Sequence, residues 1–212
     1  MTNLTETIAD LRVEFERAAD SKTLEIMSTA TADLAATGVV NHSVKTGDKA
    51  PTFQLKSHIE DVISLTDLLS KGKVVLSFYR GGWCPYCNLE LSSLQQVKAE
   101  IEATGATLVA ISPETPDFAS LTHEKNELGY DILFDEGNSI AKAYGLEFEL
   151  DERLRPVYKN FGLDIPAHNG EDTFKLPIPA TYVINQNGTI DYHFVDADYI
   201  KRLEPKEVLN HL

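Results

Sequence analysis

Apolar residues recur at helical spacing near the start of the chain. Between residues 4 and 15 they return every three to four positions, and residues 24–34 repeat the pattern after Ser21. Residues 1–37 contain neither glycine nor proline, and Gly38 is a natural C-terminal stop for a helix. We therefore expect residues 1–43 to form a helical extension of one or two helices. We expect this extension to pack against the rest of the chain. The alternative is that it forms a dimer contact.

From Gly47 onward, strand and helix signals alternate. Residues 73–79 form a β-rich run without polar alternation, which indicates a central strand buried on both faces. Residues 85–102 carry helical periodicity that ends near Gly105. The pattern predicts further strands at residues 107–111 and 131–134, and further helices at residues 116–125 and 139–144.

The last part of the chain adds a hairpin and a helix. Residues 180–184 and 189–195 are strand-like and flank an Asn-Gln-Asn-Gly turn. Pro205 is expected to open a C-terminal helix. Residues 147–176 are polar and are predicted to be a long irregular insertion. Strand–helix–strand–helix followed by a hairpin and a helix is the order of the thioredoxin fold, so we expect residues 44–212 to form one α/β domain of this class.

Composition and charge argue against nucleic-acid and membrane partners. The 212 residues are 42% hydrophobic, which is typical of a globular chain, and the net charge is −14. A field of that sign repels phosphate backbones and anionic lipids, so we expect no nucleic-acid and no membrane partner. The first residues lack the basic and apolar regions of a signal peptide, and no apolar stretch is long enough to span a bilayer. We therefore expect a cytoplasmic protein.

The chain has only two cysteines, Cys84 and Cys87, so no disulfide framework holds its fold together. They lie where the buried strand at residues 73–79 meets the helix that follows. The sulfur of Cys84 is expected near the N-cap, where a backbone N–H and the helix dipole favour a thiolate. Pro85 fits the first helical position. Such a setting lowers a thiol pKa of ~8.5 to ~3.5–7.5, and the second thiol one turn along can close a disulfide. The pattern predicts a redox couple.

Two other interpretations of this cysteine pair compete with redox chemistry. A Cys-x-x-Cys is half of a zinc site, but a closed site needs two more ligands, and the six histidines form no second ligand pair. Two inert buried thiols are the remaining alternative. The position of the pair directly after a strand favours redox chemistry over both, so we expect no metal.

The sequence around the pair resembles two known families. Residues 83–87, Trp-Cys-Pro-Tyr-Cys, resemble the thioredoxin active-site turn with the Pro-Tyr interior of glutaredoxins. Residues 47–55 are similar to the entry strand of peroxiredoxins of the alkyl hydroperoxide reductase/thiol-specific antioxidant family. Residues 78–90 align with the Phe-Tyr-Pro-x-x-x-Thr-x-x-Cys-x-x-Glu stretch of that family. The resemblance covers about residues 44–146 and 177–195. It implies a thiol peroxidase with Cys87 at the peroxidatic position, no cofactor, and a homodimer.

Three positions depart from the peroxiredoxin pattern. Arg80 stands where the family has its motif proline, and Cys84 replaces the threonine that normally hydrogen-bonds the peroxide. Pro179 stands where the family has a distal arginine, and it fits instead the cis-proline that thioredoxins keep opposite their cysteines. We therefore expect a peroxiredoxin frame with thioredoxin-type site residues. In it Arg80 lowers the thiolate pKa and orients peroxide, and Trp83 shields the sulfurs.

Three functions remain open at this point. In a peroxidase, Cys87 attacks the peroxide, Cys84 resolves the sulfenic acid, and a thioredoxin- or glutathione-type thiol donor reduces the disulfide. In a thiol–disulfide oxidoreductase, Cys84 is the more exposed thiol and attacks a substrate disulfide. In a redox sensor without turnover, the disulfide changes a partner surface.

Five further residues are expected near the site. Tyr86 is predicted to be exposed and available to partners. Glu90 is either a solvated helix carboxylate or a proton relay. Arg153, Arg155 and His168 of the insertion are candidates to line the pocket.

Overall fold

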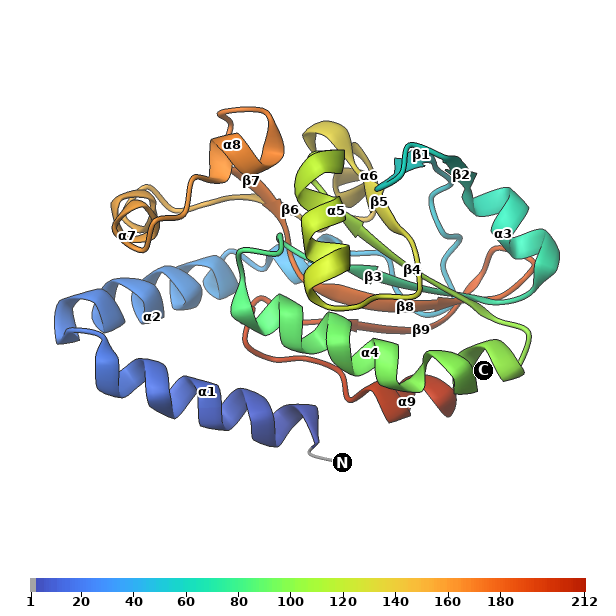
Figure 1. Cartoon of the computed structure of the whole chain (residues 1–212), viewed down its shortest axis with the longest axis horizontal. Helices are drawn as coiled ribbons and strands as arrows, with labels where there is room; N and C mark the ends of the chain where they lie inside the picture. Colours follow the sequence, from blue (N-terminus) through green and yellow to red (C-terminus); the bar gives the residue numbers. More distant parts are fainter. Residues whose placement is uncertain (1–2) are drawn as a thin grey trace.

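The computed structural model describes residues 3–212, so the first two residues of the predicted N-terminal extension lie outside the described chain. Within this range, seven strands form one mixed sheet in the order β2-β1-β5-β4-β3-β8-β9, and β6 pairs with β7 in a separate hairpin (Figure 1). The strands are β1 (Gln54–Ser57), β2 (Val62–Ser64), β3 (Val74–Phe78), β4 (Thr107–Ser112), β5 (Ile132–Phe134), β6 (Glu147–Glu149), β7 (Lys175–Pro177), β8 (Ala180–Ile184) and β9 (Ile190–Val195). The α-helices are α1 (Leu4–Ala18), α2 (Ser21–Ala36), α3 (Leu65–Lys71), α4 (Pro85–Ala103), α5 (Pro116–Lys125), α6 (Ser139–Ala143), α7 (Leu154–Asn160), α8 (Ile165–Asn169) and α9 (Pro205–Leu209).

The predicted elements of the main domain are confirmed. β3 is buried along its whole length and pairs in parallel with β4 and antiparallel with β8. This is the central position that its unbroken apolar run predicts. The hairpin of β8 and β9 turns through residues 185–188, and α9 begins at Pro205. These elements could be predicted from local sequence, because hydrophobic periodicity and turn residues are features of a few neighbouring positions.

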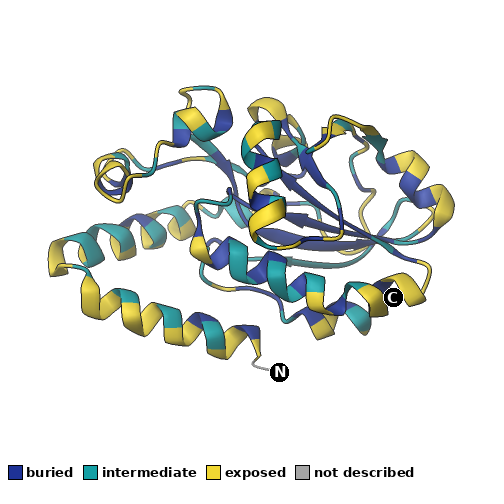
Figure 2. Cartoon of the chain, viewed as in Figure 1, coloured by how far each residue is buried: buried dark blue, intermediate teal, exposed yellow. Residues whose placement is uncertain are grey.

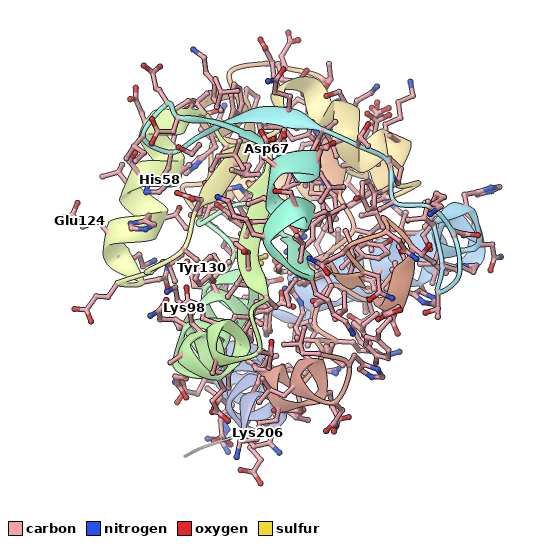
Figure 3. All side chains as sticks on the ribbon, turned by 90° about the vertical axis from the view of Figure 1, so that its right-hand side faces the viewer. His58, Asp67, Lys98, Glu124, Tyr130 and Lys206 are labelled. Carbon is pink, nitrogen blue, oxygen red and sulfur yellow. The ribbon has the colours of Figure 1, made fainter. Side chains whose placement is uncertain are left out.

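Two apolar cores pack against the sheet, and its central strands are coloured as buried in Figure 2. Alternate residues of β3 point to opposite sides, so Val75 joins the core shared with α4 and α9, and Leu76 joins the core shared with α3 and α6. The charged side chains Glu124 and Lys206, which are both exposed, point outward in the view turned by 90° (Figure 3). Among residues 3–212 the buried charged residues are Arg80, Glu90, Glu114, Asp135 and Arg202.

The two N-terminal helices form a hairpin beside the sheet domain (Figure 1). α1 contacts α4, and α2 contacts α7. The start of α1 is held by the buried side chain of Leu4 and by Glu204, which accepts a hydrogen bond from the Leu4 backbone N–H at 3.3 Å. The hairpin therefore reaches from α9 to the insertion, past the N-terminus of α4.

The segment 147–176 is more ordered than the sequence suggested. It was expected to be irregular, but it contains β6, α7, α8 and most of β7. Its own apolar cluster includes Leu154, Val157 and Ile165, and α2 contributes Ala30. The short elements were missed because they are only three to seven residues long and draw their stability from these long-range contacts.

Candidate active site

The loop between β3 and α4 delivers the two cysteines. Cys84 is the N-cap of α4 and Pro85 occupies the first turn, as predicted. Gly81 and Gly82 allow the loop to lie close to the side chains of Trp83 and Thr122. A Cβ on Gly81 would lie 2.2 Å from the Trp83 indole nitrogen, and one on Gly82 would lie 1.9 Å from the Thr122 hydroxyl. Only glycine fits at either position without displacing these side chains.

Both thiols are reduced and both side chains are buried. The expectation that Cys84 would be the more exposed thiol is therefore wrong, because α1, α2 and α7 close over the N-terminus of α4. The expected backbone cap is also absent: no backbone N–H donates to the Cys84 sulfur. Its main donor is a side chain instead.

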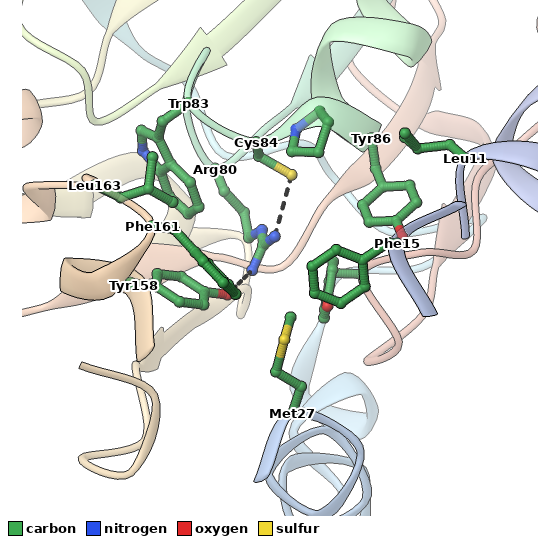
Figure 4. Close-up of a pocket in the computed structure, with 12 residues that line it drawn as sticks. Leu11, Phe15, Met27, Arg80, Trp83, Cys84, Tyr86, Tyr158, Phe161 and Leu163 are labelled. Carbon is green, nitrogen blue, oxygen red and sulfur yellow. Dashed lines mark hydrogen bonds between the residues drawn. The ribbon is translucent and has the colours of Figure 1, made fainter. Parts of the chain in front are cut away.

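Arg80 lies directly beside Cys84. Its Nη2 donates to the Cys84 sulfur at 3.1 Å, and its Nη1 donates to the Tyr158 hydroxyl at 3.2 Å (Figure 4). The guanidinium carbon lies 4.0 Å from the ring centre of Tyr199 and 5.0 Å from that of Trp83. Only 3% of Arg80 is exposed, so its charge acts on the sulfur with little screening by water.

A second arginine, Arg202, serves the other cysteine. Its Nη2 lies 3.5 Å from the Cys87 sulfur, and its Nη1 forms an ion pair with Glu90. It also donates to the backbone carbonyl of Tyr199 at 2.7 Å. Sequence reasoning gave Arg202 no role. No local pattern marks it, because its contact with Cys87 joins residues 115 positions apart.

The surroundings make the two thiols unequal. Burial opposes ionisation of Cys84, but a hydrogen bond from Cys87 and the charges of Arg80 and Arg202 outweigh it, and hold the pKa of Cys84 well below its usual range. Burial and the neighbouring Cys84 anion raise the pKa of Cys87 well above its usual range. The arrangement therefore favours the thiolate form at Cys84 and the protonated form at Cys87.

An apolar cavity of about 250 Å³ borders Cys84 (Figure 4). Its lining includes Trp83 and Tyr86 from the site loop and helix α4, and Tyr158 and Phe161 from the insertion. Tyr86 was expected to be exposed, but it is buried and packs edge-on against Tyr199, with ring centres 5.8 Å apart. Trp83 packs against Tyr158 with ring centres 5.6 Å apart, so it walls the cavity beside the sulfur.

Pro179 does not have the expected cis geometry. No peptide bond in residues 3–212 is cis, so the bond from Ile178 to Pro179 is trans. Pro179 is buried just before Ala180, which pairs with Phe78, and it borders a second cavity that also touches Arg80. The prediction from thioredoxin-like site residues was wrong here, and the bond has the isomer that most X–Pro bonds adopt.

The three candidates in the insertion lie away from the cavity at Cys84. Arg153 pairs with Asp33 at 2.6 Å, Arg155 pairs with Glu149, and His168 pairs with the buried Glu114 at 3.0 Å. The insertion contributes apolar and aromatic side chains to that cavity, and none of these three charged or titratable ones. The prediction that these three residues line the pocket was wrong, because each is held by a carboxylate elsewhere.

Glu90 is buried rather than solvated. Burial raises its pKa, and the charge of Arg202 offsets part of that shift.

We expect Glu90→Gln to lower the free energy of unfolding by about 3–5 kcal/mol, because it leaves the Arg202 charge buried without a counter-charge. Urea unfolding of the reduced protein measures this. Glu100→Gln, an exposed position on the same helix, is the matched control, and equal loss in both variants would contradict the prediction.

Two absences apply to residues 3–212. No three histidine, cysteine or carboxylate side chains gather there in a way that would hold a metal ion. No helix in the same part of the chain has the length and apolar character needed to cross a membrane.

A paired-cysteine site at the N-terminus of a helix in an α/β sheet of this order defines a thioredoxin-fold thiol oxidoreductase. The chain matches the AhpC/TSA family over residues 46–193. It is 27% identical to a putative peroxiredoxin bcp of Haemophilus influenzae, over 74% of this chain and 96% of that protein. It is 33% identical to the thiol-disulfide oxidoreductase ResA of Oceanobacillus iheyensis, over 77% of this chain and 72% of that protein.

Solved structures agree on the fold. The crystal structure of peroxidoxin BcpB from Mycobacterium tuberculosis superposes with a TM-score of 0.62, at 22% identity, over 79% of this chain and 96% of that one. The family match over residues 46–193 shows that the protein belongs to the AhpC/TSA family and is a peroxiredoxin-like oxidoreductase. The fold class and the family resemblance expected from the sequence are confirmed.

Proposed function

We propose that this protein is a thiol-dependent peroxidase in which Cys84 attacks the peroxide and Cys87 resolves the product. The observation that carries the assignment is the Cys84 sulfur, which borders the cavity and accepts a hydrogen bond from Arg80 at 3.1 Å. Cys87 does not line that cavity, and its raised pKa keeps it protonated. The proposal reverses the roles that alignment with the peroxiredoxin motif implied, because the thiolate is the nucleophilic form.

The first step oxidises one sulfur. The Cys84 thiolate attacks the terminal oxygen of a hydroperoxide, the S–O bond forms as the O–O bond breaks, and Cys84 becomes a sulfenic acid. The alkoxide or hydroxide that leaves takes a proton from water and departs as an alcohol or as water. Arg80 faces the negative charge on both sides of this step, first on sulfur and then on the leaving oxygen.

The second step closes the disulfide. Cys87 attacks the Cys84 sulfur, an S–S bond replaces the S–O bond, and the hydroxyl group leaves with the Cys87 proton as water. Arg202 lies 3.5 Å from the Cys87 sulfur and is positioned to stabilise its charge as the proton leaves. Two equivalents of a thioredoxin- or glutathione-type thiol then reduce the disulfide. The donor, the homodimer and the cytoplasmic location stay predictions.

Rapid mixing of the reduced protein with peroxide tests the proposal. Trp83 is the only tryptophan and lies one residue before Cys84, so its fluorescence reports oxidation of the pair. We expect both hydrogen peroxide and an organic hydroperoxide to oxidise the protein at least ~100-fold faster than free cysteine, through ionisation and orientation of the thiolate. Rates equal to that of free cysteine with every peroxide would refute it.

A second function rests on a separate observation. The first cysteine of the pair carries the low pKa, which is the arrangement a disulfide reductase needs, and the chain is similar to a thiol-disulfide oxidoreductase. The same reduced protein, mixed with a small aromatic disulfide, separates the two. Fast reaction with the disulfide and slow reaction with peroxide would favour this second function.

A further inference from the structure

A buried carboxylate lies at the edge of the sheet that carries the site loop, and the chemistry described above does not use it. Glu114 follows β4, and its side chain is completely shielded from solvent. Because β3 and β4 are parallel, Glu114 lies at the same edge as Tyr79, which follows β3. A carboxylate in such a place is costly unless several donors hold it.

Three side chains from separate parts of the chain surround this carboxylate. The Tyr79 hydroxyl and the Thr122 hydroxyl of α5 both donate to Oε2 of Glu114, each at 3.2 Å. His168 of α8 has its Nδ1 3.0 Å from Oε1. Burial and the charge of Glu114 raise the pKa of Tyr79 well above its ordinary value, so the phenol stays a donor. Glu114 therefore joins the sheet, α5 and the insertion.

Two of these donors lie on either side of Arg80 in the site loop. Tyr79 directly precedes Arg80 in the chain. Thr122 packs against the loop at Gly82, where a Cβ would lie 1.9 Å from the Thr122 hydroxyl oxygen. The backbone before and after Arg80 is thus held by groups bonded to one carboxylate. The guanidinium extends from this backbone to the Cys84 sulfur at 3.1 Å, so its position depends on that of the loop.

Helix α5 holds the loop by a second route. The side-chain amide of Asn88 on α4 donates to the Gly82 carbonyl at 2.7 Å. Asn126, the C-cap residue of α5, donates to the Asn88 side-chain oxygen at 2.9 Å and so fixes the orientation of that amide. Asn126 also donates to the Thr122 carbonyl at 2.8 Å. The position of α5 against Glu114 therefore affects the loop at two points.

The insertion reaches this network through His168. The ring centres of His168 and Phe118 are 4.0 Å apart, and the His168 backbone carbonyl accepts a hydrogen bond from the Thr115 N–H at 2.9 Å. These contacts place α8 beside the first turn of α5 (Figure 1). His168 contacts the carboxylate oxygen of Glu114 that Tyr79 and Thr122 leave free. Its link to the site loop is therefore indirect, through Glu114.

We propose that Glu114, held by His168 of the insertion, is the positioning residue that fixes Arg80 beside the Cys84 sulfur. This inference rests on the proposed function, in which Cys84 is the attacking thiolate. Within residues 3–212 Glu114 does not line the cavity at Cys84, so it acts on the reaction only through the loop. The insertion then does more than cover the site, because it keeps the loop in the conformation in which Arg80 meets the sulfur.

The test is the pH dependence of thiolate absorbance near 240 nm in reduced Glu114→Gln. Glutamine has the same size, but its amide nitrogen accepts no hydrogen bond, so at least one of the three donors loses its partner. We expect Arg80 to move from the sulfur and the lower midpoint, that of Cys84, to rise by about one pH unit. Below both midpoints, oxidation by peroxide should then slow about tenfold with the ionised fraction. Loss of the Glu114 charge alone would act in the opposite direction, since removing a nearby anion favours a thiolate.

Three further variants distinguish positioning from a general loss of structure. Glu124→Gln, at an exposed position on the same helix α5 (Figure 3), is the matched control and should leave the midpoint unchanged. His168→Ala should raise the midpoint. His168→Asn should restore it, because the asparagine amide places a donor where the imidazole Nδ1 lies. Urea unfolding of each variant checks that the protein measured is folded.

The outcomes separate the two proposals. An unchanged or lowered midpoint in folded Glu114→Gln, with fast oxidation of the wild type, would overturn the positioning role and leave the peroxidase intact. A raised midpoint together with slow oxidation of the wild type would support the positioning role and overturn the peroxidase. Should Glu114→Gln fail to fold, the His168 variants decide. A wild-type midpoint in His168→Ala would then overturn the inference, and a rise that His168→Asn reverses would support it.

Discussion

Cys84→Ser is expected to lower the second-order rate constant for oxidation by peroxide at least ~10³-fold. A serine hydroxyl at its ordinary pKa is a poor nucleophile, and Cys87 cannot take over, because its own pKa is raised by burial and by the adjacent sulfur. Cys87→Ser is expected to keep a fast first oxidation and to stop at the Cys84 sulfenic acid, since no resolving thiol remains. Stopped-flow fluorescence of Trp83 measures the first step, and mass spectrometry of a sulfenic-acid adduct identifies the product.

The two single variants form a matched pair, because each removes one sulfur from the same helix and leaves the other in place. Urea unfolding of both checks that a difference in rate does not arise from a difference in folding. The opposite pattern, with oxidation lost in Cys87→Ser and retained in Cys84→Ser, would contradict the proposal. It would show that Cys87 attacks the peroxide, as alignment with the peroxiredoxin motif implied.

Arg80→Gln is expected to slow peroxide oxidation about 30-fold at pH 7 through ionisation alone. A thiol with the unperturbed pKa of ~8.5 is only about 3% ionised at that pH, whereas the wild-type Cys84 is held as thiolate by Arg80 and its neighbours. Because Arg80 lowers the pKa of Cys84, its loss raises that pKa. The pH profile of the oxidation rate therefore moves to higher pH. Absorbance of the thiolate near 240 nm, followed as a function of pH, measures the shift.

The pH dependence of two variants distinguishes the effect of the Arg80 charge from that of its guanidinium geometry. Arg80→Gln should recover most of its deficit above pH 9, where the thiol ionises without help. Arg80→Lys should keep a low pKa but lose the simultaneous contacts with the Cys84 sulfur and Tyr158, because an ammonium group lacks the planar fork of a guanidinium. A variant with glutamine that keeps the wild-type pH profile would contradict the assigned role.

Local sequence determined the secondary structure outside residues 147–176 as far as it was predicted, and it determined the kind of chemistry. The unbroken apolar run of β3, the turn at residues 185–188 and Pro205 each predicted their element, because strand burial, turn geometry and the first helical turn depend on adjacent residues. The cysteine pair at the strand–helix junction predicted a redox site, since three-residue spacing places both sulfurs at one end of α4. The motif frame predicted the family.

Only the tertiary structure indicates which of the two cysteines favours the thiolate form. Arg202 lies 115 positions from Cys87, Phe15 lies 69 positions from Cys84, and no local pattern signals either contact. Burial also sets the state of Glu90, Tyr86 and both thiols, and burial depends on how separate elements close over one another. A pKa responds to desolvation and to every charge nearby in space, so it follows from the assembled fold, which here brings two arginines and an N-terminal hairpin to one helix end.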